Sequence, residues 1–295
     1  MTGRPVLVAA HLLAEFSTRA EDLLVAARKV RAREGDEAVH DLRVATRRLS
    51  DILSLWRAAL ERRPARRARR ALDSLRRALG TVREHEVHAD LLAKLLDGGP
   101  PELASAGRSL QSRLEARLEK DRARAAIAAD AAGVARILAR VERATAGVAA
   151  RLAAEPALIE QALTRSARRV ERARAAISDL PQGAPDDTLH RARIEAKKAR
   201  YTLECMNAIG VRREKDTERA FRKAQRDLGT AHDWATLSAW IEKERTRRLR
   251  HVVAAASDFA LTHEDESIAA LAARVAELEK ETREGFRPPE GLAGA

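Results

Sequence analysis

Two short segments of this sequence place basic side chains at a spacing that suits the binding of an anion. The first, His40 to Arg48, reads His-x-x-Arg-x-x-x-Arg-Arg, and the second, His190 to Lys198, reads His-x-x-Arg-x-x-x-Lys-Lys. Residues three, four and seven positions apart share one face of an α-helix. Each segment therefore predicts a helix face from which an imidazole, a guanidinium and a further cation donate hydrogen bonds to anionic oxygens.

Each of these basic faces lies opposite an apolar one. The apolar side of the first helix carries Leu42, Leu49, Leu53, Trp56 and Leu60, and that of the second carries Ala199, Leu203 and Met206. A helix of this kind buries its apolar side. We therefore expect the basic side chains of both segments to face a shared surface or cavity. They include Arg43, Arg47, Arg193 and Lys197.

A further helix in each half repeats the pattern of a basic side opposite an apolar seam. In the first half this seam contains Leu72 and Leu75. Basic residues lie on the side away from this seam, and we predict that they bind the same anion. They are Arg66, Arg70 and Arg77 in the first half and Lys215, Arg219, Arg222 and Arg226 in the second, where Arg222 takes the place of Asp73. Arginines that merely reflect codon usage would be scattered, so the stripes favour binding over a solvated face.

Both histidines are expected near the start of their helices. Asp36 and Asp186 each stand four residues before a histidine and are predicted to cap the helix N-terminus. The partial positive charge at that end of a helix favours phosphate oxygens. For His40 or His190 taken alone, a capping or surface role is as plausible as anion contact, but the matched pair favours contact.

The two segments belong to a longer internal repeat. His190 follows His40 by 150 positions, and Leu-Gly-Thr at 228–230 follows its copy at 79–81 by 149. Two motifs in the same order and at nearly one offset predict an internal duplication.

The pattern along the chain predicts an all-α fold, with helical spacing of apolar residues and no strand. We expect helices at 6–33, 37–62, 65–96, 102–130, 133–153, 157–179, 187–209, 212–246, 248–262 and 265–284. They are predicted to form one domain of residues 1–284, made of two bundles of four or five helices related by a pseudo-twofold. The repeats would span 6–130 and 156–284, with a helical connector at 131–155 and a disordered tail at 285–295.

The composition limits the partners and the compartment. The net charge of +12 favours nucleic acid, an anionic membrane or a phosphate polymer as partner, whereas the 3% of aromatic residues leaves few rings for base stacking. Cys205 is the only cysteine, which excludes an intramolecular disulfide. No apolar run approaches a signal peptide or a membrane span of about 20 residues, so we expect a soluble, cytoplasmic protein.

These motifs resemble those of the CHAD family, the conserved-histidine α-helical domain. The resemblance rests on His-x-x-Arg-Val-x-x-Arg-Arg-Leu at 40–49, its echo at 190–201, and two copies of Leu-Gly-x-x-basic-acid at 79–84 and 228–233. It spans roughly residues 6 to 284.

The resemblance implies basic helices around a central cavity or groove that binds inorganic polyphosphate, with association with polyphosphate granules in some members. The candidate binding residues are His40, Arg43, Arg47, Arg48, Arg66, Arg70, Arg77, His190, Arg193, Lys197, Lys198, Arg200, Tyr201, Lys215, Arg219, Arg222 and Arg226. Two departures suggest that the halves bind unequally. Asp51 occupies the position equivalent to Tyr201, and Glu204 lies on the second basic face.

The sequence predicts no enzyme and no cofactor. Family members are often fused to a triphosphate-hydrolysing domain with a Glu-x-Glu-x-Lys signature, and the nearest match, at 277–281, misplaces the lysine. His85 and His88 lie one helical turn apart, but metal sites need about three or four ligands, so we assign no metal. The alternative function is non-specific binding of nucleic acid by the same stripes. A phosphohydrolase is the least favoured class.

Overall fold

The computed structural model describes residues 3–35, 37–97, 101–211, 214–255 and 262–289, together with Leu292. These residues form eleven helices and no strand, which confirms the all-α prediction. In chain order the helices are α1 (Gly3–Ala32), α2 (Ala38–Leu55), α3 (Arg62–Ala78), α4 (Gly80–Leu96), α5 (Pro101–Ala128), α6 (Ala131–Thr145), α7 (Val148–Ala154), α8 (Ala157–Ser178), α9 (Asp186–Ala208), α10 (Lys215–Ala255) and α11 (Thr262–Glu284).

Several helix boundaries differ from those predicted. The expected helix at 65–96 is divided at Leu79, beside Gly80, whose low helix propensity favours a break there. The expected helix at 37–62 ends at Leu55, and α3 starts at Arg62, so Pro64 lies in its first turn, where proline is tolerated. The connector is two helices rather than one, divided near Gly147. Conversely, residues 215–255 form one continuous helix, α10, which joins parts of the two helices expected at 212–246 and 248–262.

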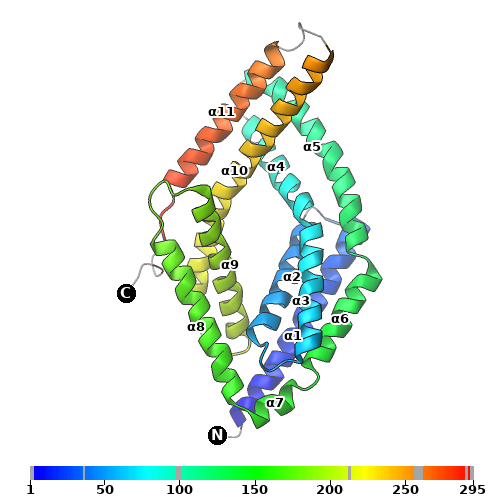
Figure 1. The fold of residues 1–295 in the computed structure, drawn as a ribbon, viewed down its shortest axis with the longest axis vertical. Coiled ribbons are helices and arrows are strands. Elements are labelled where there is room, and N and C mark those ends of the chain that lie inside the picture. The colour runs from blue at the N-terminus through cyan, green and yellow to red at the C-terminus, as the bar shows by residue number, and fades with distance from the viewer. Residues whose placement is uncertain are drawn as a thin grey trace.

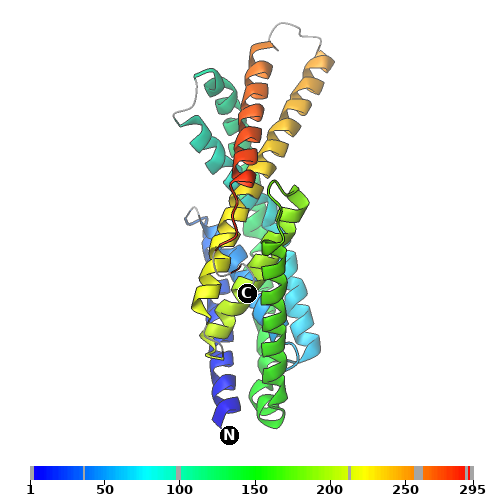
Figure 2. The ribbon, with the colours of Figure 1, turned by 90° about the vertical axis from the view of Figure 1, so that its left-hand side faces the viewer.

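The helices form an elongated molecule in which the two halves of the chain share their packing (Figure 1). The lower end in Figures 1 and 2 holds the start of α1 together with α7, while the upper end holds α5, α10 and α11. There α4 and α5 pack on α10 and α11, so this end combines helices from both halves. In the middle of the molecule α2 packs against α9, which brings the two basic segments together.

Two apolar clusters lie behind these helices. The larger one runs from α1 to the start of α8 and continues into the end of α9, α10 and α11. The smaller one is built from the rest of α8, α9 and the first part of α10, with Leu292 of the tail. Leu49 of α2 and Leu203 of α9 are fully buried in the first and second cluster respectively. The predicted burial of the apolar side of both basic helices is therefore observed.

The described part of the C-terminal tail is packed, in contrast to the predicted disorder. Leu292 is fully buried in the smaller cluster, and Phe286 packs against the same cluster. Ser178 at the end of α8 donates a 2.9 Å hydrogen bond to the Leu292 carbonyl. The prolines and glycines of this segment suggested disorder, but the apolar side chains of Phe286 and Leu292 anchor it to the core. Among the described residues, no helix combines the length and apolar character needed to cross a bilayer.

Candidate functional site

The central part of the molecule holds a group of cationic side chains from α2, α3, α4 and α9. We call it the central basic cluster, and it consists of Arg43, Arg47, Arg76, Arg83, Arg193 and Lys197. Burial lowers the pKa of Arg43, and the positive charges of Arg76, Arg83 and Arg193 lower it further. Arg43 and Arg193 come from different halves of the chain, so the repeated motifs converge as the sequence predicted.

Lys197 is the most strongly perturbed cation of the cluster. Burial is the main cause that lowers its pKa to about 7, and Arg193 lowers it further. Asp233 opposes this shift, while Arg47 and Arg43 add smaller lowering effects. This amine therefore loses its proton far more readily than an ordinary lysine. A phosphate bound beside it would favour the charged form, because an opposite charge at close range stabilises the ammonium.

The repeated glycines lie against the arginines of the two motifs. A side-chain carbon placed on Gly80 would lie 3.7 Å from Nη1 of Arg43, and one placed on Gly229 would lie 3.7 Å from Nε of Arg193. Nη1 of Arg43 also donates a 3.0 Å hydrogen bond to the Arg76 carbonyl near the end of α3. Both 3.7 Å distances are ordinary van der Waals contacts, so the glycine of each Leu-Gly-Thr motif lies directly beside the guanidinium group of an arginine from the matching histidine motif.

Carboxylates hold several of the guanidinium groups in place. Arg47 donates a 3.0 Å hydrogen bond to Asp51, and Arg193 lies 3.6 Å from Asp233. Burial raises the pKa of both carboxyl groups, an effect that these arginines oppose. Within the described part of the chain, Arg43 and Lys197 form no ion pair and keep their charge available to a ligand.

The histidines add polar groups beside the cluster. Burial and the charge of Arg83 lower the pKa of His40. The rings of His190 and His232 lie 4.9 Å apart, and burial followed by Arg193 lowers the pKa of His232 to about 4. Nδ1 of His190 and Nε of Arg193 are buried without a hydrogen-bond partner. Unsatisfied buried groups of this kind cost free energy.

The predicted cap at Asp186 is wrong, and the one at Asp36 falls outside the described residues. The residue before α9 is Pro185, so Asp186 is the first helical residue and not the cap. The residue before α2 is Glu37, whose side chain makes no capping bond, and Asp36 lies outside the described residues. His40 and His190 nevertheless lie in the first turns of α2 and α9, as predicted.

Comparison with known families identifies the fold. A family model described as CHAD domain matches residues 15–242. The chain belongs to the CHAD family. The CHAD domain of the plant Ricinus communis is 22% identical, with 96% of this chain and 93% of that chain covered and a TM-score of 0.61. PptA from Streptomyces chartreusis is 18% identical, with coverage of 93% and 96% and a TM-score of 0.67. Identities this low show a shared fold alone. No curated protein gives a significant match.

Four candidate residues of this CHAD protein lie outside the central basic cluster and contact other parts of the protein. Arg48 forms a 2.8 Å ion pair with Glu204, and Lys198 pairs with Glu195. Arg200 is largely buried, donates to Gln225 at 2.8 Å, and lies 4.0 Å from the ring centre of Tyr201. The structure gives these four residues contacts within the protein and no open position in the cluster.

The basic stripes predicted on the third helix of each half also point elsewhere. Arg66, Arg70 and Arg77 are exposed on α3, whereas the cluster is reached by Arg76 of the same helix. On α10, the exposed residues Arg219, Arg222 and Arg226 lie beside acidic neighbours, and Lys215 is exposed at the helix start. A helical wheel shows which side avoids the core, but it does not show which exposed side faces another helix.

Sequence reasoning overlooked several residues of the CHAD site. Arg83 and His232 are the basic members of the Leu-Gly-x-x-basic-acid motifs, so the motif itself carried the signal. Arg169 of α8 donates to Thr202 at 2.9 Å and to Ser54 at 2.8 Å, and it also lies near Asp51. It stands 150 positions after Arg19, the offset of the histidine motif.

The two histidines considered as metal ligands have other partners. Nδ1 of His85 lies 3.0 Å from Asp121, and Nε2 of His88 lies 3.2 Å from the Thr236 hydroxyl. Burial lowers the pKa of His88 to about 4. In the regions that the structure describes, no three side chains of the types that bind metals gather into a group.

Proposed function

We propose that this CHAD protein binds inorganic polyphosphate at the central basic cluster and leaves the polymer intact. The observation that carries the proposal is the meeting of Arg43 from one half with Lys197 from the other, both without an ion pair in the described structure. Each charge-assisted contact with a phosphate would contribute about 1.5–3 kcal/mol in such a partly buried setting.

The arrangement suits a polymer of identical phosphates. The cations come from four helices, and the ones held by carboxylates keep fixed directions. Binding would depend on the density of phosphate charge rather than on any sequence, because guanidinium and ammonium groups recognise only the anionic oxygens. The resemblance to the CHAD family favours the same ligand, and granule association follows as part of this proposal.

Nucleic acid is the alternative that the test must separate. Recognition of single strands relies on exposed aromatic rings for stacking. Tyr201 is the aromatic residue nearest to the basic motifs in sequence, and it is buried with Arg200 across its ring. Tyr201 is therefore unavailable for base stacking, which favours polyphosphate.

A competition experiment tests the proposal. Labelled polyphosphate is bound near physiological salt and challenged with unlabelled polyphosphate, single-stranded RNA and duplex DNA at equal phosphate concentration. We expect polyphosphate to displace the label most effectively, and displacement by either nucleic acid at lower concentration would overturn the proposal. Incubation with polyphosphate and a divalent metal ion should release no phosphate above the level of protein-free buffer.

A further inference from the structure

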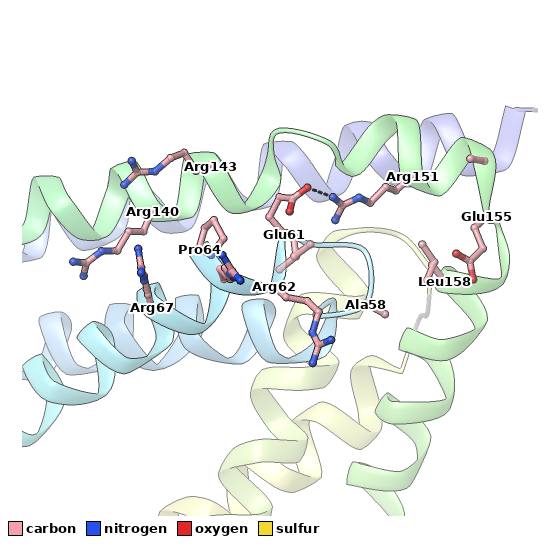
Figure 3. A pocket seen from close by; sticks show the side chains of 13 residues that line it. Ala58, Glu61, Arg62, Pro64, Arg67, Arg140, Arg143, Arg151, Glu155 and Leu158 are labelled. Carbon is pink, nitrogen blue, oxygen red and sulfur yellow. Dashed lines mark hydrogen bonds and ion pairs between the residues drawn. The ribbon is translucent and has the colours of Figure 1, made fainter.

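A second basic site lies at the opposite side of α3, away from the central basic cluster. A pocket of about 870 Å³ opens between the α2–α3 turn, α3, α6, α7 and the start of α8 (Figure 3). We call it the end pocket, and its basic lining consists of Arg62, Arg63, Arg67, Arg140, Arg143 and Arg151. None of these arginines belongs to the motifs discussed above.

Most of the charge in the end pocket is unpaired. Arg151 forms an ion pair with Glu61, as Figure 3 shows. Within the described residues, the other five arginines form no ion pair and no side-chain hydrogen bond. Glu155 is the second carboxylate of the lining, and it has no cationic partner there either. Five free guanidinium groups in one hollow repel one another, and a multivalent anion would relieve that repulsion.

The walls of the end pocket are held by the core. α3 packs against α6, with Ala65, Ala68 and Val141 buried between them. The amide of Glu61 donates a 3.0 Å hydrogen bond to the Ala144 carbonyl, which ties the α2–α3 turn to α6. In Figure 3, Arg67 of α3 and Arg140 of α6 project into the space between the two helices. The arginines therefore stand on fixed supports and not on a loose surface.

We propose that the end pocket is a second anion site, which takes a short chain of condensed phosphates independently of the central basic cluster. The pocket has room for several phosphate groups, and no aromatic ring lines it, so a nucleoside would add nothing to recognition. Along α3, Arg67 of the end pocket and Arg76 of the central basic cluster are nine residues apart, about 13.5 Å at about 1.5 Å per residue, and they point to opposite sides of the helix. A short phosphate chain would therefore occupy one site at a time. The end pocket rests on the proposed function in one respect: both sites would bind condensed phosphates.

Calorimetric titration with tripolyphosphate tests this site. Wild type should bind two equivalents, whereas a variant with Arg67→Ala and Arg140→Ala should bind one, or bind the second at least tenfold more weakly. A matched variant with Arg43→Ala and Lys197→Met should lose the other equivalent. If the Arg67/Arg140 variant titrates like wild type, the end pocket is not a site, whatever the central variant does.

Two further titrations sharpen the result. Glu155→Gln removes a repelling carboxylate from the lining, so tripolyphosphate should bind the end pocket a few-fold more tightly, and unchanged or weaker binding would overturn the assignment. ATP should bind the end pocket no more tightly than tripolyphosphate, because the pocket offers nothing to the base. A tenfold preference for ATP would overturn the proposed ligand class. Melting temperatures of all variants show that the fold is retained.

Discussion

The central basic cluster and the end pocket are both rich in cations, but they present charge in opposite ways. In the cluster most guanidinium groups are partly buried and several are held by carboxylates, such as Asp51 and Asp233. In the end pocket, Arg62, Arg63 and Arg67 are exposed and unpaired. The comparison indicates that the cluster offers few but strong contacts at fixed positions, whereas the pocket offers many contacts that water and salt weaken.

The largest effect is expected from removing the two unpaired cations of the cluster. Arg43→Ala with Lys197→Met should weaken polyphosphate binding about a hundredfold, because two contacts of about 1.5 kcal/mol each are lost. Arg66→Ala with Arg77→Ala removes the same number of positive charges from exposed positions and should change the affinity less than about threefold. Fluorescence titration with labelled polyphosphate measures both variants. Equal losses would show that net charge alone drives binding.

The apolar residues behind the cluster should affect stability and not affinity. Leu49→Ala and Leu203→Ala each open a cavity beneath a basic helix and should cost about 2–5 kcal/mol of unfolding free energy. Denaturant unfolding measures this loss, and titration at a temperature where the variant stays folded measures the affinity. A large loss of affinity in the folded variant would mean that core packing, and not the free cations, sets the site.

The pH dependence should distinguish the two regions. With its pKa lowered to about 7, Lys197 is charged at pH 6 and neutral at pH 8. Binding at the cluster should therefore weaken by up to about tenfold between these values, while the arginines of the end pocket stay charged throughout. Lys197→Met should flatten the response. A wild-type affinity that is constant from pH 6 to 8 would contradict this role.

The same lysine makes a prediction about stability. Its folded-state pKa lies below the unfolded value of 10.5, so folding releases a proton between these values and the charged form is disfavoured in the native state. Lys197→Met should therefore stabilise the free protein below pH 7, and the gain should vanish as the pH approaches 10.5. Melting temperatures across this range test the sign.

Salt should produce the smallest of these effects. Raising the ionic strength from low to physiological values should weaken tripolyphosphate binding at the exposed end pocket by several-fold more than binding at the half-buried cluster. The comparison uses the Arg43/Lys197 variant to isolate the pocket and the Arg67/Arg140 variant to isolate the cluster. A steeper salt response at the cluster than at the end pocket would contradict the stronger screening expected for the exposed arginines.

The sequence predicted the convergence of Arg43, Arg47, Arg193 and Lys197 because two independent signals agreed. Helical spacing placed each set on one face, and the internal repeat related the two sets. Neither signal depends on how the helices pack, so both are visible in the sequence itself. Gly80 and Gly229 lie at the same distance from Arg43 and Arg193 respectively, while the internal duplication itself stays a prediction.

The rest of the site depends on information that local patterns do not carry. Arg76 and Arg77 are neighbours in the same basic helix, yet only Arg76 contacts Arg43, because the crossing of α3 and α2 decides between them. Arg48 belongs to the predicted basic motif, but it pairs with Glu204 of α9, a contact that only the packing of α2 on α9 creates. The end pocket combines α3 with α6 and α7, and no repeat or motif links those segments.

The shared packing at the upper end of the molecule has a consequence for biosynthesis. The apolar face of α5, with Leu110 and Leu114 fully buried in the finished protein, packs partly on α11. The last residue of α11 is 156 positions after the last residue of α5. At about 5–20 residues per second, a nascent chain therefore leaves part of that face uncovered for about 8–30 s. During this interval the exposed apolar side chains of α5 can associate with other chains, and a chain truncated before α11 would keep them exposed.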